Sequence, residues 1–172
     1  MGSEIQSKNE ARKSKNSIYF QNLKNHILPL SEEKTDFDEA VKEWELDHVL
    51  ITEEFGKCPC SHPIKEHCYM KNKKNGNCTY VGNVCVHRFM DINTGNLFSG
   101  LTRIQKNSLA KPNLSVIEYA QQKGYLYGKN EYEFLKGITK KKKLSDKQKE
   151  WMQKINRRII LGIVVRRLNS PQ

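Results

Sequence analysis

The chain has 172 residues, of which 28% are charged and 37% are hydrophobic, so it can build one modest core or two small ones. No run approaches the roughly 20 apolar residues that a membrane-spanning helix requires, and residues 1–16 lack the apolar segment of a secretory signal. We therefore expect no membrane partner and an intracellular location, either cytoplasmic or associated with the nucleoid or nucleus.

The net charge of +11 is unevenly distributed along the chain. Residues 31–55 contain ten acidic residues and two lysines, a net charge of −8, whereas residues 56–172 contain 23 Lys/Arg and seven acidic residues, a net charge of +16. Such a basic body attracts phosphate backbones by displacing their counterions. The pattern therefore favours a nucleic-acid partner, with lysines that merely solvate the surface as the alternative interpretation.

The N-terminal part is expected to be loosely ordered at first and helical afterwards. Residues 1–30 form a basic, polar segment that we expect to be disordered or loosely ordered. Ser31 is a suitable N-cap for a short acidic helix, and a brief strand should follow at residues 49–51. The apolar stripe of that helix would be formed by Ala40, Val41, Trp44 and Leu46.

The sequence predicts a β-hairpin over residues 66–87, because Asn75-Gly76 is a pair favoured in two-residue type I′ turns. With that turn, Lys73 faces Cys78 and Glu66 faces Cys85. Side chains alternate between the two faces of a strand. One face should carry Cys68, Met70, Val81, Cys85 and His87, and the other Tyr69, Lys71, Lys73, Cys78 and Tyr80.

Beyond residue 90 the pattern becomes helical, with short helices over residues 116–123 and 131–138 and a last helix that Ser145 begins. The elements predict an α+β fold: a zinc-stapled β-hairpin with an N-terminal acidic helix and a C-terminal bundle of short helices. The corresponding domains are residues 31–92, for the acidic helix and the hairpin module, and residues 93–172, for the basic helical region. The stripe of the last helix would consist of Trp151, Ile155, Ile159 and Ile163.

Four of the five cysteines are spaced as zinc ligands. Structural zinc takes four thiolate or imidazole ligands, usually supplied as two close pairs. Cys58 and Cys60 form the first pair, and the predicted hairpin makes Cys68 and Cys85 diagonal neighbours. We therefore predict one structural Zn²⁺ per chain, with Cys78 as a spectator. The ligands would be Cys58, Cys60, Cys68 and Cys85, with His62 or His87 as substitutes for Cys68.

Other interpretations of the cysteines stay open at this point. Clustered thiols can be buried as small hydrophobic side chains. A catalytic zinc would need an open coordination position and a water-activating carboxylate, for which Glu66 is a neighbour in sequence. No base or orienting residue is evident for a nucleophilic cysteine, so we expect that the protein is not an enzyme.

The same residues carry a resemblance to a known module. The stretch C-P-C-S-H-P-I at residues 58–64, then Asn72 and V-G-N-V-C at residues 81–85, resembles the zinc-knuckle pattern C-x-C-G-x-x-I, Asn, V-G-N, Cys. That pattern is found in largely uncharacterised proteins of phages, large viruses and bacterial mobile elements. The resemblance covers residues 45–90, with a fainter match at residues 144–148, and implies a structural zinc knuckle without catalytic residues. Ser61 stands where that family usually has glycine.

Aromatic and basic residues alternate on the outer face of the predicted hairpin. Single-strand binders use such a pattern, because rings stack on bases and ammonium groups meet phosphates. A second basic region follows in residues 140–158, and β-propensity with solvated lysines is the alternative for both. The predicted contacts are Tyr69, Lys71, Lys73, Tyr80, Arg88, Lys140, Lys141, Lys142, Lys143, Arg157 and Arg158.

These observations lead to two functional hypotheses. The first is a non-catalytic, zinc-containing accessory protein of viral or mobile-element origin that binds nucleic acid, single-stranded DNA or RNA in preference to duplex. The second is a zinc-scaffolded protein-interaction module that modulates a host or replication protein. In that case the protein partner would bind the acidic segment 31–55 or the C-terminal helix.

Overall fold

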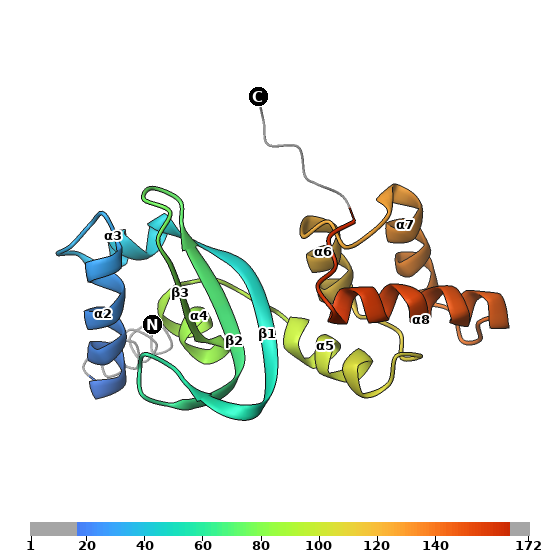
Figure 1. The fold of residues 1–172 in the computed structure, drawn as a ribbon, viewed down its shortest axis with the longest axis horizontal. Helices are drawn as coiled ribbons and strands as arrows, with labels where there is room; N and C mark the ends of the chain where they lie inside the picture. The colour runs from blue at the N-terminus through green and yellow to red at the C-terminus, as the bar shows by residue number, and fades with distance from the viewer. Residues whose placement is uncertain (1–16, 166–172) are drawn as a thin grey trace, which may run out of the picture. The chain divides into compact units, whose positions relative to one another are not determined.

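The computed structural model describes residues 17–165, which fall into two compact units divided after Asn93. The first contains a three-stranded antiparallel sheet and is called the sheet unit; the second is called the helical unit. The fold class is α+β, as the sequence predicts (Figure 1). Among the described residues, no helix is both long and apolar enough to cross a membrane.

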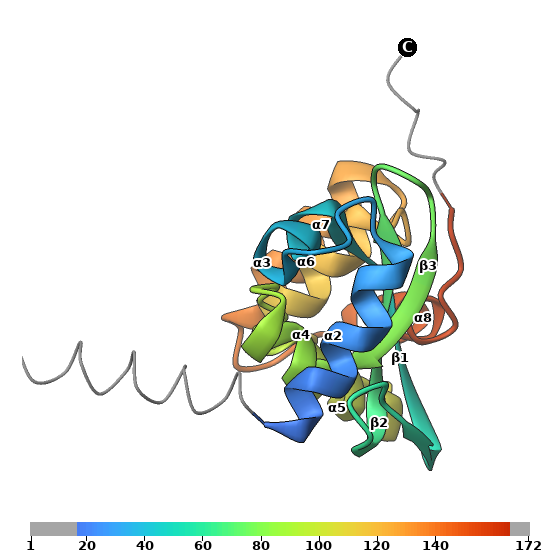
Figure 2. The same cartoon turned by 90° about the vertical axis from the view of Figure 1, so that its left-hand side faces the viewer.

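The sheet unit is built on three strands in the order β1-β2-β3, with helices against one face (Figure 2). On this covered face, Met70 and Val81 are fully buried, and Thr79 Oγ1 lies 2.6 Å from His26 Nε2 of the first helix. The core of the unit therefore lies between this face and the helices. In chain order the elements are α2 (Ile18–Leu30), α3 (Phe37–Ala40), the 3-10 helix η1 (Val41–Glu43), β1 (Trp44–Lys57), β2 (Pro63–Asn72), β3 (Cys78–Gly82) and α4 (Asn83–Phe89).

Helix α2 occupies residues where a loosely ordered segment was expected. Ser17 caps its start, because Ser17 Oγ accepts a hydrogen bond from the Phe20 N–H at 3.2 Å. Phe20, Leu23 and Ile27 are buried, and their spacing of three and four residues is the apolar period of a helix. The expectation of disorder is therefore wrong for residues 18–30, while residues 1–16 lie outside the described part of the chain.

The acidic helix is shorter than predicted and begins elsewhere. Ser31 follows the end of α2, where its hydroxyl donates to Ile27 O at 2.9 Å and accepts from Trp44 Nε1 at 2.8 Å. Asp36 is the N-cap of α3, which has only four residues. The predicted helical stripe is wrong because Trp44 buries its indole as the first residue of β1, a strand of 14 residues.

The hairpin forms, but with a wider connection than predicted. Lys71 faces Cys78, so the register differs by two residues from the predicted one. The cause is Asn72, whose Oδ1 accepts hydrogen bonds from the N–H groups of Lys74 and Asn75 at 2.8 and 3.3 Å. These bonds stabilise a loop over residues 73–77 in place of the two-residue turn.

The side-chain faces of β2 and β3 nevertheless agree with the prediction, because a shift of two residues leaves every side chain on its original face. Beyond Gly82 the prediction is wrong, since the chain leaves the sheet and enters α4. Cys85 and His87 therefore project from a helix and not from a strand.

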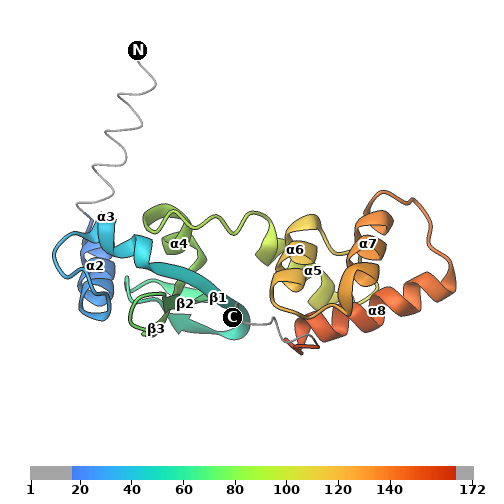
Figure 3. The same ribbon diagram turned by 90° about the horizontal axis from the view of Figure 1, so that it is seen from above.

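The helical unit contains four helices within residues 94–165 (Figure 3). Ser145 begins the last one, with Gln148 completing a capping box, as the sequence predicts. Of the predicted apolar stripe, Ile155 and Ile159 are buried, whereas Ile163 lies beyond the helix and is exposed. The helices are α5 (Leu97–Lys106), α6 (Leu114–Gln122), α7 (Gly128–Thr139) and α8 (Asp146–Ile160).

Candidate metal centre and open face of the sheet

Three buried thiols meet where α4 begins. Cys58 directly follows β1, Cys60 lies in the loop to β2, and Cys85 lies in the first turn of α4. Their exposed fractions are 1, 1 and 6%. The three Sγ atoms all lie within 4.8 Å of one another, and those of Cys58 and Cys85 are 3.7 Å apart. The three thiols could therefore hold a metal ion, and we call them the thiol cluster.

A tight turn presents Cys58 and Cys60. The Cys58 N–H donates to His62 O at 2.9 Å, and the Ser61 N–H donates to Cys58 O at 2.8 Å. This closure requires a φ of 85° at Ser61. A non-glycine residue adopts that left-handed conformation at a cost of about 1 kcal/mol. The turn thus explains why a glycine suits this position of the motif.

Gly82 allows the sheet to approach the thiol cluster. Its N–H donates to Cys58 Sγ at 3.2 Å. A Cβ at this position would lie 2.8 Å from Ile64 Cγ2 and 3.7 Å from Cys58 Sγ, so any side chain would push β2 away. The neighbouring Asn83 is bonded to Glu66 Oε2 at 3.1 Å through its Nδ2. The V-G-N part of the motif therefore has a structural role beside the cysteines.

The close packing of the thiols shifts their ionisation. The hydrogen bond from the Cys85 thiol lowers the pKa of Cys58 well below its ordinary value, which favours the thiolate form of Cys58. The same hydrogen bond, together with burial, raises the pKa of Cys85, and burial raises the pKa of Cys60. Three neighbouring thiolates repel one another, so a bound cation is needed before all three ionise.

The fourth ligand predicted from the sequence does not join this cluster. Cys68 lies on the covered face of β2, where burial raises its pKa to about 12. His62, a predicted substitute, is exposed and places Nδ1 3.7 Å from Cys60 Sγ. The other substitute, His87, is exposed in the last turn of α4, and Cys78 is exposed on β3. Of the two predicted substitutes, His62 is thus the one that lies beside a thiol of the cluster.

The donor set fits a structural zinc ion. In a tetrahedral site with Zn–S bonds of about 2.3 Å, neighbouring sulfur ligands lie about 3.8 Å apart. The Cys58–Cys85 and Cys60–His62 separations, both 3.7 Å, are close to this value. Cys58, Cys60 and Cys85 would hold the ion, with His62 as the candidate fourth ligand. A zinc ion in this site would cross-link the loop that carries Cys58 and Cys60 to helix α4.

We expect Ser61→Gly to raise the free energy of unfolding by about 0.5–1 kcal/mol, because glycine adopts a φ of 85° without strain. Ser61→Ala is the matched control, since it keeps the strain and, like glycine, loses the hydrogen bond from Asn22 Nδ2 at 3.1 Å. Thermal or urea unfolding of the zinc-loaded proteins measures both. If the glycine variant were no more stable than the alanine variant, the backbone at Ser61 would not be strained.

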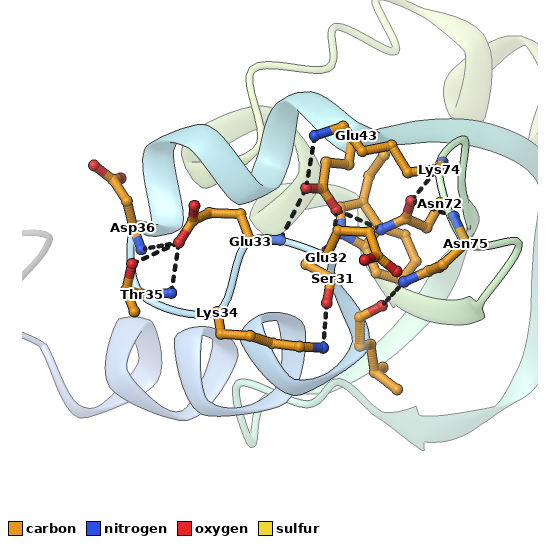
Figure 4. A network of polar contacts seen from close by, with 12 residues as sticks. Ser31, Glu32, Glu33, Lys34, Thr35, Asp36, Glu43, Asn72, Lys74 and Asn75 are labelled. Atoms are coloured by element: carbon orange, nitrogen blue, oxygen red, sulfur yellow. Dashed lines mark hydrogen bonds and ion pairs between the residues drawn. The ribbon is translucent and has the colours of Figure 1, made fainter.

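A buried carboxylate connects the hairpin loop to the segment after α2 (Figure 4). Glu43 is 2% exposed and accepts hydrogen bonds from the N–H groups of Glu32 and Glu33, from Asn72 Nδ2 and from Lys74 Nζ. Burial raises the pKa of Glu43, but these hydrogen bonds outweigh it and lower the pKa to about 2. Glu43 could not be identified from the sequence, because one glutamate in an acidic segment carries no local sign of burial.

Four aromatic rings cross the face of the sheet opposite the helices. His48 stacks on Tyr69 with ring centroids 4.3 Å apart and planes 7° from parallel. Tyr80 lies 5.7 Å from Tyr69, and His67 lies 5.3 Å from Tyr80. We call these four residues the ring row; His48 is exposed and both tyrosines are half-buried. The sequence analysis identified the tyrosines and missed the histidines, of which His48 comes from β1.

The predicted basic contacts of the sheet unit do not share one surface. Lys71 is exposed on the same face as the ring row, beside Glu45 of β1. Lys73 is exposed in the hairpin loop. Arg88 lies on α4, which packs on the covered face, and its guanidinium sits 5.4 Å from the centre of the Phe89 ring. Of these predicted contacts, only Lys71 therefore lies on the strand face that carries the ring row.

The predicted basic contacts of the helical unit fall into two kinds. Residues 140–143 follow α7 and are exposed, and Arg157 is exposed on α8. Arg158 is bonded internally instead: its Nε donates to Tyr125 O at 2.7 Å, and its Nη2 forms an ion pair with the buried Glu131. Its guanidinium therefore holds the helices together and is a poor candidate for a ligand contact.

The net positive charge belongs entirely to one unit. Residues 1–93 contain 13 Lys/Arg and 14 Asp/Glu, a net charge of −1, whereas residues 94–172 contain 17 and five, a net charge of +12. The boundary predicted from the sequence, at residue 55, lies inside β1. Residues 56–93 were therefore counted with the basic body, although they belong to the sheet unit. Long-range attraction of an anionic ligand would thus come from the helical unit.

No family model matches the chain, and no significant match is found among curated proteins or solved structures. The three cysteines of the knuckle-like motif, Cys58, Cys60 and Cys85, nevertheless converge in space. What the site can do is therefore inferred from its own chemistry.

Proposed function

We propose that the protein is a non-catalytic, zinc-containing accessory protein that binds single-stranded nucleic acid on the ring row. The ring row is the observation that carries this proposal, because it places the exposed ring of His48 and the half-exposed rings of Tyr69 and Tyr80 side by side on one sheet face, next to the buried ring of His67. Unpaired bases stack on such rings with little dependence on sequence. Bases inside a duplex are already stacked on one another, so single strands and loops are the favoured ligands.

A metal ion in the thiol cluster would stabilise the strand end next to the ring row. Tyr80 Oη donates a hydrogen bond to Lys57 O at 3.2 Å, directly before the first residue of the thiol cluster. A zinc ion that holds Cys58 against α4 would thereby also stabilise the end of β1 beside Tyr80. Zinc in this role is structural and gives the small sheet unit a cross-link that its limited core does not supply.

The charge distribution favours different roles for the two units in binding nucleic acid. Base stacking would occur on the sheet unit, whose net charge is close to neutral, and phosphate attraction would come from the helical unit with its net charge of +12. Lys71, on the face of the ring row, adds a local phosphate contact. Binding should accordingly weaken as the salt concentration rises.

We expect the double variant Tyr69→Ala, Tyr80→Ala to bind a single-stranded oligonucleotide at least about tenfold more weakly. Stacking of one base on one ring contributes roughly 1–3 kcal/mol, and 1.4 kcal/mol corresponds to a factor of ten. Fluorescence anisotropy with labelled single-stranded DNA, single-stranded RNA and duplex DNA measures the effect. Duplex binding should change little, because phosphate contacts are retained.

Two controls make this measurement specific. Tyr69→Phe with Tyr80→Phe keeps both rings and should preserve binding, although it removes the hydrogen bond to Lys57 O. Tyr132→Ala removes a tyrosine ring from α7 and should leave single-strand affinity unchanged. The alanine variant must retain its metal and its melting temperature. If it does so and binds every nucleic acid normally, the ring row is not a base platform.

Binding of a protein partner is the second candidate function, and the chemistry of β1 favours it. This strand lies at the edge of the sheet and exposes Leu50 and Phe55, with exposed fractions of 46 and 68%. It also carries the carboxylates of Glu45 and Asp47 beside the ring row, which oppose phosphate binding. Absence of measurable affinity for all three nucleic acids would make this the leading function.

A further inference from the structure

A pocket in the helical unit, lined mostly by residues with polar side chains, lies outside the ring row and the thiol cluster. It has a volume of about 500 Å³ and is lined by residues at both ends of α5, the segment between α5 and α6, the start of α6 and the end of α7. Pockets of this size hold ligands of metabolite or nucleotide size. The polar residues that line it are Asn96, Arg103, Lys111, Asn113, Ser115 and Thr139.

The two cations of the pocket are held in place by neutral groups. Arg103 Nη2 donates a hydrogen bond to Lys111 O at 2.7 Å, and Lys111 Nζ donates to Lys141 O. Backbone carbonyls position these side chains without cancelling their charge. Neither Arg103 nor Lys111 forms an ion pair with any described residue, and the pocket lining includes no Asp or Glu.

The walls of the pocket are ordered by Asn113. Its Oδ1 accepts a hydrogen bond from the Val116 N–H at 3.0 Å, and its Nδ2 donates to Asn96 O at 2.8 Å, so it ties α6 to the start of α5. Gly100 makes room for this contact, since a Cβ there would lie 2.5 Å from Asn113 Oδ1. The pocket is thus shaped by side chains that have defined partners.

We propose that this pocket binds a phosphate group, with Arg103 and Lys111 as the charged ligands and Ser115 as a hydroxyl donor. A planar guanidinium and an ammonium are the usual partners of phosphate oxygens. The phosphate can belong to a nucleic-acid backbone or to a free phosphate compound. For a backbone phosphate this inference rests on the phosphate attraction proposed above for the helical unit, but the ring row takes no part, so failure of base stacking on the ring row would leave it intact.

The test uses the full chain labelled with ¹⁵N, and follows backbone amide shifts during titration with inorganic phosphate, with sodium chloride at matched ionic strength as the reference. Amides of residues 113–116 and 139–141 should shift and saturate with phosphate and not with chloride. A second titration uses oligothymidylate that lacks terminal phosphates. Shifts of the same amides by the oligonucleotide identify a backbone phosphate, whereas shifts by inorganic phosphate alone identify a free phosphate group.

Ser115→Asp should weaken phosphate binding at least about tenfold. It places a carboxylate in the pocket lining, and because Ser115 lies in the first turn of α6, an acidic residue there suits the helix and should preserve folding. The matched control is Asn130→Asp, which adds the same charge in the first turn of α7, outside the pocket lining, and should change affinity less than twofold.

Lys111→Gln provides a second variant that removes a cation without introducing repulsion, and it should also weaken binding. Wild-type affinity in both Ser115→Asp and Lys111→Gln would show that the pocket is not the phosphate site. Absence of pocket shifts in the wild-type titrations with phosphate and with oligothymidylate would overturn the proposal outright.

Discussion

Replacement of Cys58 or Cys85 by serine is expected to release the metal and unfold the sheet unit. Apparent binding energies of structural zinc sites in small peptides are about 10–16 kcal/mol at neutral pH, whereas whole domains are stable by only about 5–15 kcal/mol. A lost thiolate ligand therefore removes a contribution as large as the stability itself. Elemental analysis should fall from about one zinc per chain towards none, and circular dichroism should lose its cooperative melting transition.

Cys78→Ser is the control for this experiment. Cys78 is the first residue of β3, is exposed and lies outside the thiol cluster, and its Sγ donates a hydrogen bond to Gly76 O at 3.5 Å. This variant should keep both metal and melting temperature. Zinc release by Cys78→Ser to the same extent as by Cys85→Ser would show that the cluster is not the metal site.

The fourth ligand can be identified with the same assay. His62→Ala should lower zinc affinity, because His62 Nδ1 lies 3.7 Å from Cys60 Sγ. Cys68→Ala should lower the free energy of unfolding, because it leaves a cavity in the core. It should still bind about one zinc per chain. The reverse outcome would restore Cys68 to the ligand set.

Glu43→Gln is expected to lower the free energy of unfolding by about 3 kcal/mol, the second large effect. A glutamine replaces one of the two accepting oxygens by an N–H₂ donor, so one pair of donors loses its partner inside the fold: either Asn72 Nδ2 with the Glu32 N–H, or Lys74 Nζ with the Glu33 N–H. Urea unfolding measures the change. Glu39→Gln is the matched control: its ion pair with Lys42 is exposed, and its loss should change stability by less than about 0.5 kcal/mol.

The effect of Glu43→Gln should depend on pH in a defined direction. The pKa of Glu43 is about 2 in the folded protein, below its ordinary value of 4.5, so the folded state binds this proton less tightly than the unfolded state. The stabilisation is complete above about pH 4.5 and is lost as the pH falls towards about 2. The difference in melting temperature between wild type and variant should therefore shrink in this range. A difference that stays constant down to pH 2 would contradict the assigned role of Glu43.

Several features followed from local sequence patterns alone. The capping box of Ser145 and Gln148 places the start of α8, because its hydrogen bonds join residues three apart. The alternation of faces along β2 and β3 is also local, since it depends only on the period of two. For this reason the prediction that Tyr69 and Tyr80 share a face survived an error of two residues in the register.

Other features were decided only by tertiary structure, because their partners are distant in the chain. Asn72 widens the hairpin loop while bonded to Glu43, 29 residues earlier, and no turn preference contains that contact. The sequence around Trp44 predicts a helix, but the indole of Trp44 is buried and donates a hydrogen bond to Ser31 Oγ. The assignment of charge to the two units likewise required knowing that the division falls after Asn93.

The thiol cluster depends on both local sequence and tertiary structure. The sequence by itself indicated a zinc site and named the residues that could form it, because metal ligands are recognised by residue type and close spacing. Which of them meet depended on the turn of the chain at Gly82, which sends Cys85 into α4 and towards Cys58 while Cys68 remains in the core. Spacing along a chain specifies the distance between neighbours, whereas the convergence of residues 27 positions apart is a property of packing.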